Sequence, residues 1–169
     1  MGHDIGIIGL GVLGSAIAKN MVAGAKSVLG FDRAESAREV AAADGVILAE
    51  SNSDVARNCS IVLTCLPNAA AVLDVAQEIA SVANEGQIVV EMSTLSIADK
   101  EAARTILEAG GRHVLDCPVS GNRIMALGRG LTAFCSGTQE DFERVRETLL
   151  TFCKKVHYVG PFGNGTKVK

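Results

Sequence analysis

The 169-residue sequence has few aromatic residues, and this scarcity limits the kind of core that it can build. It contains no tryptophan, one tyrosine and five phenylalanines, while 48% of all residues are hydrophobic. We therefore expect a core made mostly of Ala, Val, Ile and Leu. The length and the apolar fraction favour one packed domain and argue against a disordered chain.

Clusters of basic residues are also absent. The formal net charge is −3, and no run of Lys or Arg could neutralise nucleic acid or an anionic membrane surface. The first 20 residues have no cationic segment before their apolar run, and glycines interrupt that run. The sequence therefore predicts no secretion signal, no membrane span and no nucleic-acid partner, and we expect a cytoplasmic protein.

The five cysteines show neither a CxxC motif nor a paired Cys/His spacing. Such a pattern favours reduced, buried thiols and predicts no metal site. Cys117 is the cysteine of most interest, because it lies inside a motif described below.

The most informative stretch is residues 5–18, with the sequence IGIIGLGVLGSAIA. Gly9, Gly11 and Gly14 give the spacing G-x-G-x-x-G between a predicted strand and a predicted helix, which is the context that the dinucleotide-binding fingerprint requires. Gly9 permits the turn, Gly11 lets a pyrophosphate approach the backbone, and Gly14 lets the helix pack closely. The alternative is a glycine-rich turn without a ligand.

Asp32 ends the next predicted strand, residues 27–32, and follows Gly14 by 18 residues. A carboxylate at this distance is typical of contact with the adenosine ribose, and it disfavours a 2′-phosphate. We therefore expect NAD, with NADP possible because Arg33 could pair with a phosphate or stack on adenine. Asp32 could instead cap the following helix, and the two roles can coexist.

The rest of the chain alternates between predicted strands and helices. This alternation predicts an α/β domain of the doubly wound Rossmann type, with a mostly parallel sheet and helices on both faces. The further expected strands are residues 46–48, 61–66, 87–92, 113–116, 131–136 and 156–159, and the further expected helices are residues 34–43, 51–58, 68–83, 96–110 and 138–152. Residues 117–130 are expected to be irregular, and a long irregular stretch is usually functional.

Several segments extend this pattern beyond the first fingerprint. They are GLGVLG at residues 9–14, TCLPN at 64–68, EMST at 91–94, DCPVSG at 116–121, and a final G-x-G-x-x-x-K formed by Gly163, Gly165 and Lys169. Together they resemble the β-hydroxyacid dehydrogenase family, which includes 3-hydroxyisobutyrate dehydrogenase and tartronate-semialdehyde reductase-like enzymes. The resemblance covers essentially the whole chain, and the last two motifs are the most specific.

The resemblance implies a role for each matching position. The residues implied to hold the adenosine diphosphate are Gly9, Leu10, Gly11, Val12, Leu13 and Asp32, and those implied on the nicotinamide side are Leu66, Pro67 and Thr94. Ser120 and Gly121 are implied to bind a substrate carboxylate, and Lys169 to act as the general acid/base. Hydroxyl and backbone donors suit a carboxylate, and an ammonium can give its proton as hydride arrives. Such a lysine needs a lowered pKa.

Two departures from the family pattern matter. Asn122 replaces the family's second glycine and precedes Arg123, which suggests a different or more oxygenated acid as the substrate, with Asn122 among its ligands. The family's chains also continue beyond the lysine into a helical domain that closes the site and builds a dimer. Residues 1–169 are therefore expected to form the cofactor-binding domain, inactive by itself, of a chain that is a homo-oligomer when full-length.

The sequence thus predicts an oxidoreductase that transfers a hydride between NAD(P) and a small 3-hydroxy acid or its semialdehyde. The alternative is a non-catalytic, regulatory dinucleotide-binding module. We also expect Ser120 and Gly121 to share a crevice with the ends of the strands that close at Thr64 and Met92.

Overall fold

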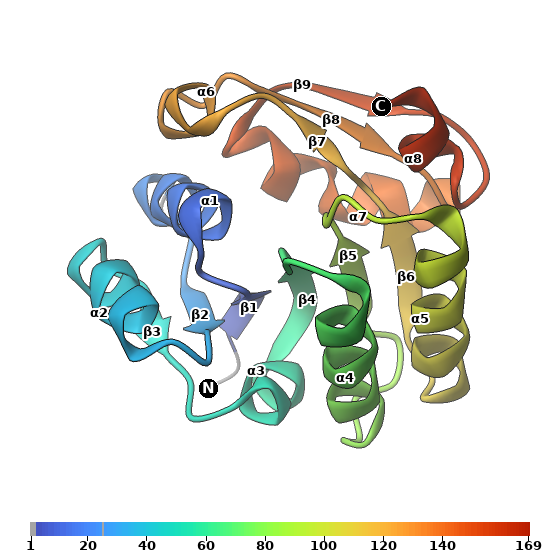
Figure 1. Ribbon diagram of the computed structural model, residues 1–169, viewed down its shortest axis with the longest axis horizontal. Coiled ribbons are helices and arrows are strands. Elements are labelled where there is room, and N and C mark those ends of the chain that lie inside the picture. The colour runs from blue at the N-terminus through green and yellow to red at the C-terminus, as the bar shows by residue number, and fades with distance from the viewer. Residues whose placement is uncertain (1–2, 25) are drawn as a thin grey trace.

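The main sheet contains six parallel strands in the order β3-β2-β1-β4-β5-β6 (Figure 1). The computed structural model describes residues 3–24 and 26–169. The strands are β1 His3–Ile8, β2 Val28–Phe31, β3 Ile47–Leu48, β4 Cys59–Thr64, β5 Ile88–Glu91 and β6 His113–Asp116. This order is that of a Rossmann fold, with its switch point between β1 and β4, and it confirms the predicted fold class.

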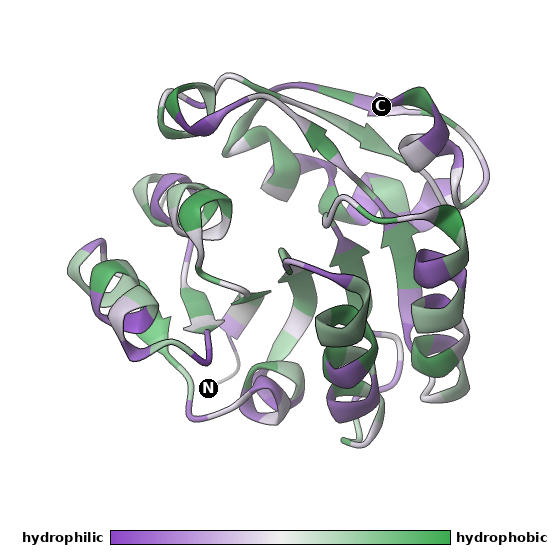
Figure 2. Ribbon diagram, viewed as in Figure 1, coloured by the Kyte–Doolittle hydropathy of each residue, from purple (hydrophilic) through white to green (hydrophobic). Residues whose placement is uncertain are grey.

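Helices cover both faces of this sheet. Helices α1 Val12–Ala23, α2 Glu35–Ala43 and α7 Gln139–Leu150 lie on one face, and α3 Asn52–Asn58, α4 Ala69–Ala80 and α5 Ile97–Ala109 lie on the other. Strand β1 shows the alternation, because Ile7 packs in the core with Ile17 of α1 while Ile8 packs in the core with Val55 of α3. Most strand residues are hydrophobic, as the green colour in Figure 2 shows, and strand residues belong to the cores on both faces of the sheet, which is typical of a parallel sheet.

Most of these helices begin at the capping residues that the sequence suggests. The side chains of Ser51, Asn68, Ser96 and Thr138 accept hydrogen bonds from the amide three residues later, at the starts of α3, α4, α5 and α7. Helix α1 instead starts after Gly11, which has no side chain to cap it. Its first N–H groups are therefore available to a ligand.

A second, smaller sheet lies at the carboxyl ends of β5 and β6 (Figure 1). It consists of β7 Val119–Ser120, β8 Leu131–Cys135 and β9 Cys153–Tyr158, with β7 antiparallel and β9 parallel to β8. Strand β7 follows β6 after two residues, and a bridge between Asp116 and Ser136 joins the two sheets. The chain ends in the short helix α8, Asn164–Val168, beside this sheet.

The expectation that residues 117–130 are irregular is wrong in part. They contain β7 and the short helix α6, Arg123–Leu127, which begins after Asn122 and packs on α1. A strand of two residues and a helix of five are too short to show periodicity. The neighbouring Pro118, Gly128 and Gly130 further hide them.

At the amino edge of the main sheet, buried polar side chains bind the free carbonyls of helix ends. Arg112, which is 3% exposed, donates to the carbonyls of Ile79, Val82 and Gly110. Gln87 donates through Nε2 to the carbonyl of Ala56 at 2.7 Å. These carbonyls lie at the carboxyl ends of α3, α4 and α5, where helices leave such groups without partners. Within the described residues, no helix is long and apolar enough to cross a membrane.

Candidate functional site

The three glycines of the fingerprint differ in what surrounds them. Gly9 has a φ of 94°, and a Cβ there would lie 2.2 Å from the carbonyl oxygen of Cys65. A Cβ at Gly14 would lie 1.9 Å from the carbonyl oxygen of Gly9, so this glycine allows α1 to pack against the turn. A Cβ at Gly11, by contrast, would meet no atom within 4 Å. The chain itself gives no steric reason for a glycine at this position.

Asp32 connects the glycine turn to the end of β2. Its Oδ2 accepts the N–H of Leu10 at 2.8 Å, and its Oδ1 accepts the N–H of Ala34 at 2.8 Å. Ala34 occupies the N-cap position of α2, and its side chain makes no capping hydrogen bond. The Asp32 carboxylate therefore binds the backbone at the start of this helix from two residues before the N-cap. Each carboxylate oxygen can accept a second hydrogen bond, which leaves capacity for a hydroxyl of a ligand.

A cavity of about 490 Å³ opens at the carboxyl ends of β1, β2, β4 and β5. Its size lies in the range of small-molecule and cofactor sites. The lining residues are Ile8, Gly9, Gly11, Val12, Leu13, Gly14, Asp32, Arg33, Asn52, Cys65, Leu66, Pro67, Ala71, Asp74, Val75, Glu78, Met92, Ser93 and Thr94. All of the sequence-predicted cofactor residues except Leu10 line this cavity, and the side chain of Leu10 is buried in the core.

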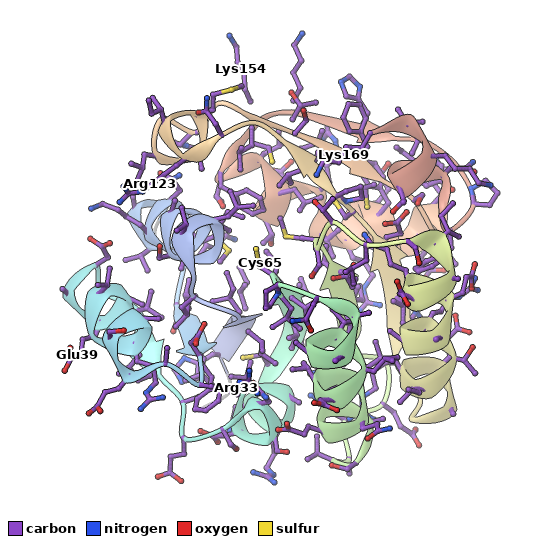
Figure 3. All side chains as sticks on the ribbon, in the orientation of Figure 1. Arg33, Glu39, Cys65, Arg123, Lys154 and Lys169 are labelled. Carbon is purple, nitrogen blue, oxygen red and sulfur yellow. The ribbon has the colours of Figure 1, made fainter. Side chains whose placement is uncertain are left out.

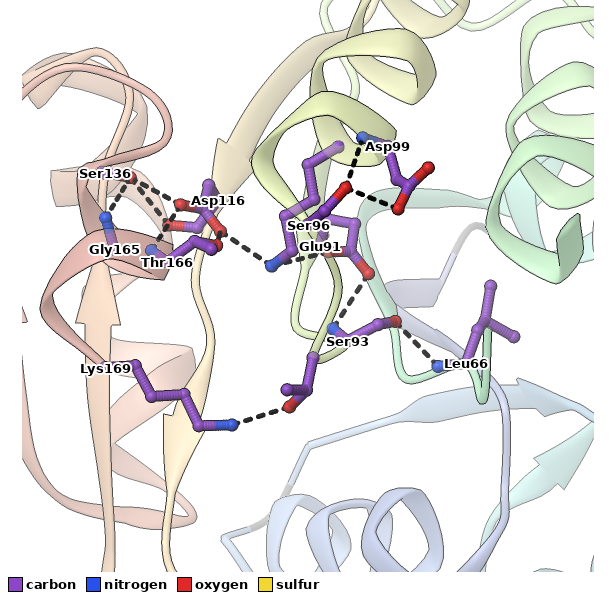
Figure 4. Close-up of polar contacts among 12 residues, drawn as sticks. Leu66, Glu91, Ser93, Ser96, Asp99, Asp116, Ser136, Gly165, Thr166 and Lys169 are labelled. Carbon is purple, nitrogen blue, oxygen red and sulfur yellow. Dashed lines mark hydrogen bonds and ion pairs between the residues drawn. The ribbon is translucent and has the colours of Figure 1, made fainter. Parts of the chain in front are cut away.

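The end of the cavity opposite Asp32 is held by a chain of hydrogen bonds (Figure 4). The N–H of Leu66 donates to Ser93 Oγ at 2.9 Å, and the N–H of Ser93 donates to Glu91 Oε1 at 2.9 Å. Ser93 is 4% exposed, so these bonds are shielded from water. They fix the loops after β4 and β5 relative to each other.

Lys169 reaches the rim of the cavity through Thr94. Its Nζ donates to Thr94 Oγ1 at 2.7 Å (Figure 4). Figure 3 shows the side chain of Lys169 between the second sheet and the loop that carries Cys65. Burial lowers the pKa of Lys169, the charge of Lys100 lowers it further, and Cys65 acts in the opposite direction. A lysine in this setting can exchange a proton closer to neutral pH than an exposed lysine can.

The predicted substrate residues lie outside the lining of this cavity. Ser120 ends β7, Gly121 has a φ of 142°, and Asn122 caps α6 by accepting the N–H of Met125 at Oδ1. A Cβ at Gly121 would also lie 2.6 Å from Leu131 Cδ2, the end of a side chain, so the positive φ is the main structural reason for a glycine here. All three residues belong to the sheet and helix that cover the carboxyl edge (Figure 1).

The surroundings of Cys65, Cys117 and Cys153 raise the pKa of their thiols, which makes these three cysteines poor nucleophiles near neutral pH. A hydrogen bond with Cys135 and burial raise the pKa of Cys117 well above its usual range. Burial raises the pKa of Cys65, the one that lines the cavity, to about 11. Across residues 3–24 and 26–169, no group of three or more His, Cys, Asp or Glu side chains could hold a metal ion.

Sequence reasoning did not find several residues of the cavity wall. Asn52 begins α3, and Asp74 and Glu78 share one face of α4 at a spacing of four residues. This spacing is visible in the sequence and predicts a shared face. Which face of α4 points to the cavity depends on the packing of the helix against β4, and no local pattern reports it.

The residues present fit a dinucleotide. The space at Gly11 is open, the first turn of α1 offers N–H donors to phosphates, and Asp32 keeps acceptor capacity toward the cavity. Leu66, Val75 and Ala71 supply apolar surface for flat rings. This combination of a polar turn and apolar walls is what a nicotinamide dinucleotide needs.

Comparison with known proteins agrees with this assignment. Residues 4–160 match the family model of the NAD binding domain of 6-phosphogluconate dehydrogenase. The L-threonate dehydrogenase of Cupriavidus necator is 33% identical over 100% of this chain and 58% of its own length. The 2-(hydroxymethyl)glutarate dehydrogenase of Eubacterium barkeri is 31% identical over 98% of this chain and 56% of its own length.

A solved structure is similar along the same span. The 3-hydroxyisobutyrate dehydrogenase of Mycobacterium tuberculosis, solved with L-serine, superposes with a TM-score of 0.95 at 28% identity. The match covers 99% of this chain and 58% of that one. The chain therefore spans somewhat more than half the length of the relatives it matches.

Proposed function

Because the chain belongs to the family of the NAD binding domain of 6-phosphogluconate dehydrogenase, we propose that it is the cofactor-binding part of a hydroxyacid dehydrogenase. The reaction is hydride transfer between the nicotinamide and a small 3-hydroxy acid or its semialdehyde. The observation that carries this proposal is the Lys169–Thr94 hydrogen bond at the rim of the cavity. It brings a proton donor to the end of the cavity away from Asp32.

The first part of the proposal concerns the cofactor. The pyrophosphate lies at the turn formed by Gly9 to Leu13, where backbone donors and the positive end of α1 meet its charge. Asp32 accepts hydroxyls of the adenosine ribose, and Arg33 covers the same end of the cavity. Leu66, Pro67 and Thr94 border the nicotinamide end. The bound dinucleotide supplies or accepts the hydride.

The second part concerns the proton. Lys169 gives a proton to the alkoxide that develops when hydride reaches a carbonyl, and it takes the proton back in the oxidation direction. Thr94 orients the ammonium group through the 2.7 Å hydrogen bond. The lowered pKa of Lys169 suits this exchange.

The third part concerns the substrate. We infer that Ser120, Gly121 and Asn122 bind its carboxylate through a hydroxyl, backbone N–H groups and a carboxamide. They lie on the sheet and helix above the carboxyl edge, so a substrate between them and the cavity would bring its reacting carbon near Lys169. The names of the relatives, which act on threonate and on 2-(hydroxymethyl)glutarate, favour a small hydroxy acid as the substrate class.

A second candidate function is a regulatory dinucleotide-binding module without catalysis. The observation that favours it is that neither Lys169 nor Ser120 lines the cavity itself. Lys169→Ala separates the two functions. In a dehydrogenase it lowers turnover by roughly 10²- to 10⁴-fold and leaves NAD affinity within about twofold, because proton transfer and cofactor binding are separate steps.

The matched control is Lys167→Ala, two residues earlier on α8 and exposed. Turnover is followed by NADH absorbance with a panel of 3-hydroxy acids, in the 169-residue chain and in longer chains that contain it. Equal loss of activity in both variants would show that a general charge effect, and not Lys169, is responsible. Tight NAD binding without turnover of any acid would favour the regulatory module.

A further inference from the structure

Lys100 is a fully buried cation on α5 that no part of the proposed chemistry uses. It is 1% exposed, and its Nζ lies 2.8 Å from Asp116 Oδ1 and 2.9 Å from Glu91 Oε2. Glu91 ends β5 and Asp116 ends β6, and the two residues are paired in the register of these strands. One ammonium group thus bridges two neighbouring strand ends at the carboxyl edge, which is where the proposed site lies.

From Asp116 the contacts continue to Lys169 (Figure 4). Asp116 Oδ2 accepts the N–H of Thr166 at 2.9 Å, and Oδ1 accepts its hydroxyl at 2.8 Å. Ser136 Oγ donates to Asp116 and accepts the N–H of Gly165 at 2.9 Å. These bonds hold the start of α8, and Lys169 lies one turn after Thr166. The position of Lys169 therefore depends on Asp116.

From Glu91 the contacts continue to Thr94. Glu91 Oε1 accepts the N–H of Ser93, and Thr94 is the next residue. Lys169 and Thr94, which share the 2.7 Å hydrogen bond, are thus each tied to one of the two carboxylates that Lys100 joins. Residues 75 positions apart in the sequence are brought together through a single buried ammonium group.

Stability by itself does not account for such a cluster. Moving charges from water into a protein interior costs several kcal/mol per ion, and buried ion pairs often stabilise no more than apolar side chains of the same volume. What a buried, hydrogen-bonded cluster does provide is a defined geometry. The Lys100 charge also contributes to the lowered pKa of Lys169, which shows that the two groups are close enough to interact.

We propose that Lys100, acting through Glu91 and Asp116, is a positioning residue that holds Lys169 against Thr94 at the rim of the cofactor cavity. This inference rests on the proposed role of Lys169 as the proton donor. Lys100 is not among the residues that line the cavity, and its contacts toward Thr94 and Lys169 run through these two carboxylates.

The mildest test changes the link between Asp116 and α8. Thr166→Val keeps the size of the side chain and the backbone N–H but removes the hydroxyl bond to Asp116. In a longer chain that contains these residues and turns over a hydroxy acid, we expect kcat to fall about 10-fold, with NAD affinity within about twofold, because a small displacement of a catalytic group is costly to the rate. Thr166→Ser, which keeps the hydroxyl, should restore kcat. A purely structural role of Thr166 would not produce this split.

The stronger test removes the bridge. The double variant Lys100→Met with Glu91→Gln deletes one charge of each sign, and Asp116 keeps its bonds to Thr166 and Ser136. We expect kcat to fall about 100-fold. We also expect crystal structures with NAD to show Lys169 Nζ beyond hydrogen-bond distance of Thr94 Oγ1. The matched control is Glu108→Gln, which breaks an exposed ion pair with Arg104 on the same helix and should change neither quantity.

The outcomes separate the inference from the proposed function. A folded double variant that keeps both its kcat and the Lys169–Thr94 distance would overturn the inference. If the double variant does not fold, the comparison of Thr166→Val with Thr166→Ser decides, and equal kcat values would overturn it as well. If Lys169→Ala retains full turnover, the proposed function fails, while the Nζ–Oγ1 distances still test whether Lys100 positions Lys169.

Discussion

Gly11 allows cofactor binding to be tested separately from folding. Its φ of −66° and ψ of −162° are accessible to any residue, and a Cβ there would meet nothing within 4 Å. Gly11→Val should therefore change the free energy of unfolding by no more than about 1 kcal/mol, the scale of changes at helix N-cap positions. The new methyl groups would instead occupy the space that we assign to the pyrophosphate.

The expected loss of affinity follows from the bonds that the phosphates would lose. A hydrogen bond to a charged group contributes about 1.5–3 kcal/mol. Moving the pyrophosphate away from two N–H groups at the start of α1 therefore costs about 3–6 kcal/mol, or roughly 10²- to 10⁴-fold in Kd. Gly11→Ala, with a single methyl group, should give a smaller loss in the same direction.

The assay combines calorimetric titration with NAD and thermal unfolding of each variant. Gly14→Ala is the contrasting variant, because its Cβ would lie 1.9 Å from the carbonyl oxygen of Gly9 and must displace α1. It should lower Tm and affinity together, whereas Gly11→Val should lower affinity while Tm stays nearly constant. A folded Gly11→Val protein that binds NAD as tightly as the parent would refute the assignment of the turn.

Three further predictions address other parts of the molecule. Asp32 should make NAD bind roughly 100-fold more tightly than NADP, because a 2′-phosphate about 5 Å from its carboxylate is repelled by about 3 kcal/mol at an effective dielectric constant of about 20. Titration of Asp32→Asn with both cofactors should show this preference reduced, and tighter NADP binding by the parent would remove Asp32 from the role. Burial raises the pKa of Cys65 from 9.0 to about 11, so alkylation at pH 8, followed by mass spectrometry, should be about 100-fold slower than for an ordinary thiol and should accelerate up to about pH 11. Arg112→Met should lower the free energy of unfolding in urea by about 3 kcal/mol, because helix carbonyls lose a charged donor, and an unchanged urea midpoint would contradict this.

The main sheet was predictable because its signals are local. Each parallel strand contains a short apolar run, and Ser51, Asn68, Ser96 and Thr138 lie at the N-cap positions of their helices. The glycine spacing likewise reports a turn whose geometry depends on a few consecutive residues. Such features depend on backbone conformation and burial, which neighbouring residues largely determine.

The parts that sequence reasoning missed depend on contacts between distant residues. Lys100 lies among charged neighbours, in the sequence Asp99-Lys100-Glu101, and looks like part of an exposed helix face. Its burial is decided by the carboxylates at the ends of β5 and β6. The separate sheet of β7, β8 and β9 was missed for the same reason, because its strands pair with one another and not with the main sheet.

The amino edge of the main sheet has a consequence for how this protein can vary. There, Arg112 and Gln87 donate hydrogen bonds to carbonyls at the ends of α3, α4 and α5. Substituting either residue should therefore lower the amount of folded protein before it affects cofactor binding. At the carboxyl edge, Gly11 can change while the core stays packed, although Gly9 and Gly14 of the same turn cannot. A library of single substitutions could be scored separately for the abundance of folded protein and for cofactor binding. Substitutions at the amino edge should lower abundance, and substitutions such as those at Gly11 should lower cofactor binding alone. Positions such as Gly11 could then change cofactor binding while the amino edge keeps the fold.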